Sequence, residues 1–228
     1  MRFKSGLIIG VFGLVVVILG DFYFAIGITG LTYFALLELF RMAEFTGIKP
    51  ATKTTLFSCF ILIISTYLEL KGIIGEEISN AILPISSIGI CTWLLLQPKP
   101  GKISDIATSI FGLFYLGFLP SYWIRLRELD SIFIGSNYQG NGFSDLGYIS
   151  GFNITLISCL IIVSSDIGSY LFGKIFGKKS LSPISPSKTV EGLIGGIFCS
   201  ISTGILFTYL FNWNNYLIIG IVFGIIIS

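Results

Sequence analysis

An aspartate inside an apolar run is the first residue that could do chemistry. Asp166 lies in such a run, beside Ser164 and Ser165. A carboxylate in hydrocarbon costs about 2.5–3.5 kcal/mol on insertion scales unless it faces a cavity or a partner, so it is a functional candidate by default. The alternative is a polar contact between helices, satisfied by the serines or by a lysine. Tyr170 and Lys174 follow at four-residue intervals and would share a helix face with Asp166.

Four lysines and no acid occupy the polar segment that spans residues 174–188. Their ammonium groups would attract anions at a membrane surface, such as nucleotide or lipid phosphates. The ordinary enrichment of lysine in cytoplasmic loops also explains Lys178 and Lys179. We expect a cytoplasmic loop over residues 174–189 that carries the binding motif.

The octapeptide over residues 185–192, with the sequence SPSKTVEG, is harder to explain by topology alone. Pro186 is typical of a turn, and Ser187 is expected to cap the helix that follows, with residues 188–191 in its first turn. A helix N-terminus presents free N–H groups and a positive dipole end, which suits phosphate. Lys188 would add a full positive charge there.

Glu191 has three open roles: it could bind a metal, orient Lys188, or favour the helix dipole. Small residues follow it, and Gly192, Gly195 and Gly196 would let another backbone or a ligand come close. The simpler alternative is a plain helix cap followed by a packing motif.

The amino-acid composition indicates which class of protein must position these residues. Hydrophobic residues make up 54% of the 228 residues and charged residues 11%, whereas soluble domains carry about 25% charged residues. The chain contains no histidine, which excludes a Ser-His-Asp triad and histidine metal ligands. Its four cysteines lie in apolar runs without CxxC spacing, which indicates buried thiols. A net charge of +2 argues against a general nucleic-acid surface.

Runs of apolar residues predict an all-α, polytopic transmembrane helix bundle of about seven or eight spans, forming one membrane-embedded domain over residues 1–228. The N-terminal run follows Arg2 and Lys4 but lacks a small-residue cleavage site, so we expect an uncleaved span. The predicted spans are 6–20, 22–40, 55–70, 79–96, 104–124, 152–173, 190–211 and 214–228.

Basic residues are distributed unevenly between the two sides of this arrangement. With the N-terminus in the cytoplasm, eleven of the fourteen basic residues fall on the inner side, and only Lys71, Arg125 and Arg127 lie outside. The segment 125–151 is then an external loop rich in glycine. We expect a multi-pass cell-membrane protein with a cytoplasmic N-terminus.

The segment from Asp166 to Gly196 resembles the CDP-diacylglycerol synthase family, also called phosphatidate cytidylyltransferases. The likeness rests on the pattern D-x-G-x-Y-x-x-G-K followed by S-P-x-K-T-x-E-G, over about 35 residues. It implies that CTP and phosphatidic acid react to give CDP-diacylglycerol and pyrophosphate, with Mg²⁺ required. A phosphate monoester is already a nucleophile at neutral pH, so catalysis needs positioning and charge neutralisation rather than a histidine base.

The resemblance implies roles for particular residues. Asp166, Lys188 and Glu191 would be catalytic, with Asp166 also a metal ligand. The substrate-binding residues would be Tyr170, Lys174, Ser185, Ser187 and Thr189.

The C-terminal signature of that family, which is acidic and contains histidine, is absent from the sequence. We therefore expect the chain to be the N-terminal part of a longer protein, with the remaining metal ligands beyond Ser228 and no activity by itself.

Other readings of the sequence stay open. Asp166 could be the ion-coupling residue of a transporter or channel, although no internal repeat is visible and the charged motif lies at one membrane face. A structural membrane scaffold would explain the composition but not the proline-serine-lysine motif. Glycine pairs spaced four apart, Gly6/Gly10, Gly192/Gly196 and Gly220/Gly224, fit contacts within the chain or a homodimer.

Overall fold

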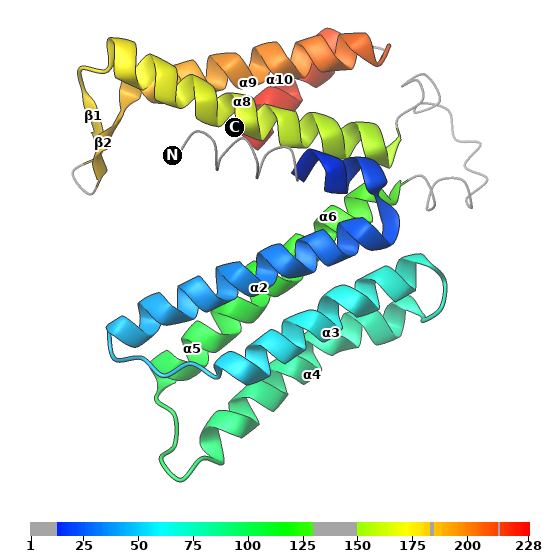
Figure 1. Ribbon diagram of the computed structural model, residues 1–228, viewed down its shortest axis with the longest axis vertical. Helices are drawn as coiled ribbons and strands as arrows, with labels where there is room; N and C mark the ends of the chain where they lie inside the picture. The colour runs from blue at the N-terminus through cyan, green and yellow to red at the C-terminus, as the bar shows by residue number, and fades with distance from the viewer. Residues whose placement is uncertain (1–12, 130–149, 183–184, 214) are drawn as a thin grey trace. The chain divides into compact units, whose positions relative to one another are not determined.

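The computed structural model describes residues 13–129, 150–182, 185–213 and 215–228 (Figure 1). They belong to two compact units, Met1–Ile132 and Phe133–Ser228, and each unit is described by itself.

Unit 1 is made of helices. Residues 13–19 are helical and precede the first labelled helix. The elements that follow are α2 (Asp21–Phe45), α3 (Thr52–Leu70), α4 (Glu76–Leu95), α5 (Ile103–Gly112), a π-helical stretch (Leu113–Phe118) and α6 (Leu119–Arg127). The last three form one continuous helical rod, because the backbone stays helical from Ile103 to Arg127.

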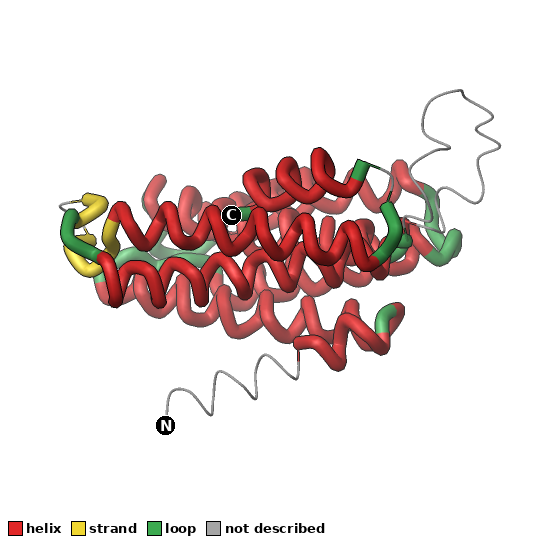
Figure 2. The backbone as a smooth tube through the Cα atoms, turned by 90° about the horizontal axis from the view of Figure 1, so that it is seen from above, coloured by secondary structure: helices red, strands yellow, loops and turns green. Residues whose placement is uncertain are grey.

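The described residues of unit 2 form three helices and a hairpin. Its elements are α8 (Gly151–Phe176), β1 (Ser180–Ser182), β2 (Ser185–Thr189), α9 (Val190–Leu210) and α10 (Tyr216–Ile227). The strands pair antiparallel, with Ser180 opposite Thr189 and Ser182 opposite Ser185. In Figure 2 the strands, drawn in yellow, lie at the ends of the helices that they connect.

The described helices confirm the predicted all-α membrane fold. Six helical segments are long and apolar enough to cross a membrane, and α10 is a shorter apolar helix over the last predicted span. The first predicted span, 6–20, begins in residues outside the described part of the chain. The predicted external loop, 125–151, also falls largely outside it.

The predicted loop over residues 174–189 is wrong in detail. Helix α8 continues to Phe176, and residues 180–189 form the hairpin. Pro186 fits this extended backbone because a strand at a sheet edge tolerates a missing N–H. Helix α9 begins only at Val190, so Ser187 is not its cap and Lys188 is not in its first turn.

Ion pairs connect the helices at one end of unit 1. Arg125 of α6 donates two hydrogen bonds to the carboxylate of Glu69 in α3, both 2.8 Å long. Lys71 follows α3, and its Nζ lies 2.6 Å from an Asp21 carboxylate oxygen. That hydrogen bond raises the pKa of Lys71. Two of the three basic residues predicted on the outer side therefore have acidic partners within their own unit.

Candidate active site

Glycines let α8 and α9 lie in close contact. A Cβ added at Gly168 would stand 2.7 Å from Cys199 Sγ and 2.9 Å from the carbonyl oxygen of Gly195. A Cβ at Gly196 would clash with the Ser169 hydroxyl oxygen. A Cβ at Gly192 would lie 2.8 Å from the carbonyl oxygen of Ser169. The predicted close approach at the glycines of α9 is therefore confirmed, and its partner is helix α8.

Contacts within unit 2 explain the two spaced glycine pairs that fall in the described residues. Gly192 and Gly196 face α8, as above. A Cβ added at Gly220 or Gly224 would meet the backbone of α9 at Ile205 and Ile201. The third pair, Gly6/Gly10, lies outside the described residues. The described pairs therefore need no second copy of the chain to explain them.

Thr189 begins helix α9. Its hydroxyl oxygen accepts a hydrogen bond from the Gly192 N–H at 3.1 Å, which is the N-cap geometry expected one residue before a helix. Sequence reasoning assigned this cap to Ser187. The signal for the correct assignment was present, because Thr189 is also a good capping residue and lies three residues before Gly192.

Glu191 holds the base of the hairpin. One of its carboxylate oxygens accepts hydrogen bonds from the backbone N–H groups of Lys178, at 3.2 Å, and Lys179, at 3.4 Å. The Val190 N–H donates to the carbonyl oxygen of Lys179 at 3.0 Å and closes the same junction. The first turn of α9 is thereby tied to the segment that leaves α8.

The lysines of the motif surround this junction. Lys174, Lys178, Lys179 and Lys188 are all exposed, and none forms an ion pair with another described residue. Glu191 is the only acid between residues 174 and 192. The hairpin end of unit 2 is therefore a positively charged surface whose ammonium groups remain available to an anion.

Tyr170 and Lys174 share one face of α8, as predicted. The Lys174 Nζ lies 5.8 Å from the centre of the Tyr170 ring, and both side chains are exposed.

Asp166 is exposed on α8 and makes no hydrogen bond or ion pair with another described residue. The neighbouring serines are used elsewhere: Ser164 donates to the Ile161 carbonyl oxygen, and the Ser165 hydroxyl lies 3.1 Å from that of Ser228. The polar contact that would explain Asp166 as a clamp between helices is therefore absent from the described residues.

Asp166 and Lys188 occupy different depths of unit 2. The start of α9 packs beside Gly173, because a Cβ added there would lie 3.0 Å from the Thr189 hydroxyl oxygen. Gly173 is seven residues beyond Asp166 on the same helix, a rise of about 10 Å. Lys188 lies at the level of Thr189, its neighbour in β2. The two residues would therefore contact different groups of a substrate rather than one atom.

No group of three acidic or cysteine side chains that could hold a metal occurs among the residues that the structure describes. Asp166 alone does not make a metal site. It would suit Mg²⁺ only as one ligand beside water and substrate phosphates, an arrangement that Mg²⁺ commonly adopts.

Comparison with known proteins places this chain in a family. The whole chain, residues 1–228, matches the Cytidylyltransferase family. A protein of Synechocystis named phosphatidate cytidylyltransferase is 37% identical over 92% of this chain and 73% of its own length. The chloroplastic phosphatidate cytidylyltransferase 5 of Arabidopsis thaliana is 29% identical over 99% of this chain and 58% of its own length. The Bacillus subtilis phosphatidate cytidylyltransferase is 28% identical over 90% and 70%.

No solved structure matches the chain at a significant level. The chain spans between about half and three quarters of the length of these relatives. The family match extends over both units, far beyond the 35 residues that carried the resemblance, and it confirms the predicted enzyme class over a transporter or a scaffold. The chain belongs to the cytidylyltransferase family.

Proposed function

We propose that this protein transfers the cytidylyl group of CTP to phosphatidate, giving CDP-diacylglycerol and pyrophosphate. An oxygen of the lipid phosphate bonds to the α-phosphorus of CTP, the bond from that phosphorus to the β-phosphate oxygen breaks, and pyrophosphate leaves with the electron pair. The names of the three relatives support the substrates. The observation that carries the proposal is the group of four lysines in and just before the hairpin, at the ends of membrane helices α8 and α9.

The lysines would bind the triphosphate. Lys188 on β2, with Lys174 at the end of α8, offers ammonium groups where negative charge moves onto the leaving pyrophosphate. Thr189 already accepts the Gly192 N–H, so its own hydroxyl hydrogen remains available to a phosphate oxygen. Ser185 and Ser187 lie on the same strand, and Tyr170 lies beside Lys174. These residues are the proposed substrate-binding set.

Asp166 would act deeper along α8, on the phosphate of the lipid substrate. Its exposed carboxylate would supply one ligand to Mg²⁺, with substrate phosphates among the others. Bound Mg²⁺ would neutralise charge on the reacting phosphates. Glu191, the third residue of the predicted catalytic set, would be a positioning residue through its hold on the hairpin.

We further propose the cell membrane as the location, with the N-terminus and the hairpin in the cytoplasm. The lysine excess of the hairpin end supports this orientation. A cytoplasmic hairpin would meet CTP from water and phosphatidate from the bilayer at one surface.

Two substitutions in the full-length protein test the proposed site. We expect Lys188→Ala and Asp166→Asn each to lower kcat/KM for CTP-dependent cytidylyl transfer at least about a hundredfold, because the first removes an ammonium group that would contact phosphate and the second removes a carboxylate that would bind Mg²⁺. Lys53→Ala is the matched control, since Lys53 is an exposed lysine in the first turn of α3. Turnover equal to wild type in both site variants would remove this assignment. Release of CDP instead of pyrophosphate would identify a phosphoryl transfer and contradict the proposed reaction.

A further inference from the structure

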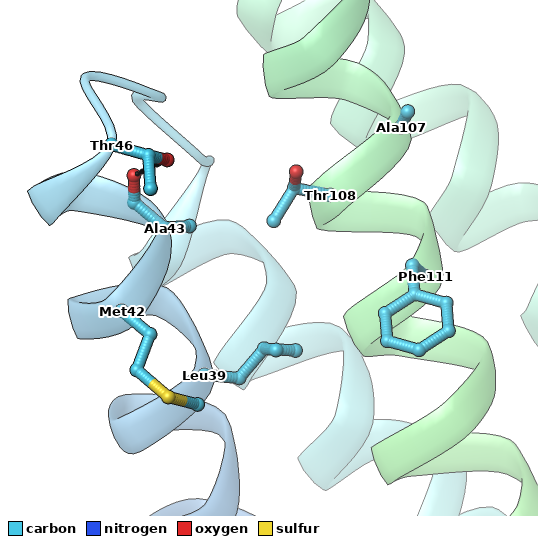
Figure 3. Close-up of a pocket in the computed structure, with 7 residues that line it drawn as sticks. All are labelled: Leu39, Met42, Ala43, Thr46, Ala107, Thr108 and Phe111. Carbon is cyan, nitrogen blue, oxygen red and sulfur yellow. Dashed lines mark hydrogen bonds between the residues drawn. The ribbon is translucent and has the colours of Figure 1, made fainter. Parts of the chain in front are cut away.

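Unit 1 carries an open apolar groove between α2 and α5, with a volume of about 470 Å³. Figure 3 shows Leu39 of α2 and Thr108 of α5 pointing into the space between the two helices. The groove is lined by Leu39, Met42, Ala43, Thr46, Ala107, Thr108 and Phe111. No charged side chain is among these residues, so the groove suits a hydrocarbon ligand.

The groove ends where the two helices meet. Gly112 packs against Leu36 and Phe40, because a Cβ added at Gly112 would lie 3.0 Å from a side-chain carbon of each. Leu36 and Phe40 are both fully buried there. From Leu39 to Thr46 the groove follows seven residues of α2, or about 10 Å along the helix axis.

Two lysines lie near this groove in the chain, since Lys49 follows the lining residue Thr46 by three positions and Lys102 precedes Ala107 by five. Asp105 lies two residues before Ala107 and is only 6% exposed. Its two carboxylate oxygens accept the backbone N–H groups of Lys49 and Lys102, each at 2.8 Å. Both lysines are exposed and neither forms an ion pair with another described residue. Asp105, one helical turn before the lining residue Thr108, therefore fixes the backbone of two cationic residues.

Ser109 adds two further hydrogen bonds to this arrangement. The Ser109 hydroxyl oxygen accepts the Ala51 N–H at 2.9 Å and donates to the Asp105 carbonyl oxygen at 2.7 Å. The connection between α2 and α3, which carries Lys49, is thereby held against the first turns of α5.

We propose that the groove binds one acyl chain of an anionic glycerophospholipid, whose phosphate contacts Lys49 and Lys102. The mainly apolar lining favours a membrane lipid over a water-soluble anion, because five of its seven residues offer an anion no hydrogen-bonding side chain. The two lysines select an anionic head group over a zwitterionic one. This site belongs to unit 1 alone and does not depend on the proposed reaction.

Photo-crosslinking tests the site without CTP, so its result is independent of catalysis. The full-length protein in detergent is mixed with phosphatidate that carries a diazirine on one acyl chain, irradiated, and digested for peptide mapping. We expect cross-links on the peptides that contain residues 39–46 and 107–111. An excess of unlabelled phosphatidate should suppress them at least about fivefold more than an excess of phosphatidylcholine.

Two sets of variants test the contributions of the groove and of the lysines to lipid binding separately. Ala107→Trp should fill the groove and lower its cross-linking at least about fivefold. Gly89→Trp should not, because a Cβ at Gly89 meets no heavy atom within 4 Å. Loss of both groove lysines, Lys49→Gln with Lys102→Gln, should abolish the preference for phosphatidate.

The matched control for the lysine pair is Lys53→Gln with Lys99→Gln, which removes the same charge from exposed residues outside the bonds to Asp105. It should keep the preference. Equal competition by the two lipids in the wild-type protein would overturn the proposal, as would undiminished groove cross-linking in Ala107→Trp.

Discussion

At the scale of the residue, Glu191 shows how a motif acid can be structural and functional together. Its carboxylate accepts two backbone N–H groups from the segment that leaves α8. The sequence left three roles open for it, and these bonds favour a fourth: the carboxylate positions the hairpin that carries Lys188. Such bonds could not be predicted, because they depend on where α8 ends and α9 begins.

A comparison of Glu191→Gln with Glu191→Ala distinguishes this positioning role from metal binding. Glutamine keeps an oxygen that can accept the Lys178 and Lys179 N–H groups, whereas alanine removes it. We expect KM for CTP to rise about tenfold in Glu191→Ala, the size of one or two ordinary hydrogen bonds, and to change less than threefold in Glu191→Gln. If the glutamine variant were as impaired as the alanine variant, the negative charge itself would be required.

At the scale of the element, the membrane helices were predictable and the hairpin was not. Long apolar runs specify spans because hydrocarbon leaves the backbone no other hydrogen-bond partners. The segment SPSKT is short and polar, and its serines and proline suit a turn or a cap as well as a strand. Pairing with Ser180–Ser182 decides between them, and that partner is not visible in local sequence.

Close packing of α8 against α9 leads to a prediction about stability. Gly168→Ala would place a methyl group 2.7 Å from Cys199 Sγ, so we expect the free energy of unfolding to fall by about 1–3 kcal/mol. Gly30→Ala is the control, because a Cβ at Gly30 meets nothing within 4 Å. It should leave stability unchanged or raise it by up to about 1 kcal/mol. Unfolding in SDS, followed by circular dichroism, measures both; an equal effect would contradict the packing.

The pair of Glu69 and Arg125 joins α3 to α6 and leads to a second stability prediction. Their side chains are 11% and 25% exposed, so Arg125→Met would leave a largely buried carboxylate unpaired. We expect a loss of about 3 kcal/mol in the same unfolding assay. The exchange variant, Glu69→Arg with Arg125→Glu, should recover at least half of this loss. Failure to recover would mean that packing, rather than the pair, holds the two helices.

At the scale of the whole molecule, charged residues are distributed unevenly between the two expected sides of the membrane. The basic residues at the expected outer side are few, and Lys71 and Arg125 are matched by Asp21 and Glu69. The lysines at the expected inner side that the structure describes form no ion pair with another described residue. Sequence alone could predict this asymmetry, because it depends on counts. It could not predict which charges pair, because pairing requires the packing of helices distant in sequence.

The two ends of the membrane helices can be assigned to their sides by cysteine labelling. In the described residues, three membrane-capable segments, Glu76–Leu95, Ile103–Arg127 and Gly151–Phe176, separate Ile73 from Ser180, so we expect the two positions to lie on opposite sides. In a background with the four native cysteines replaced by alanine, we expect an impermeant maleimide to label Ile73→Cys in intact cells. Ser180→Cys should react only after permeabilisation, because the lysines in and just before the hairpin retain it in the cytoplasm. Labelling of Ser180→Cys in intact cells would invert the topology and separate the hairpin from cytoplasmic CTP.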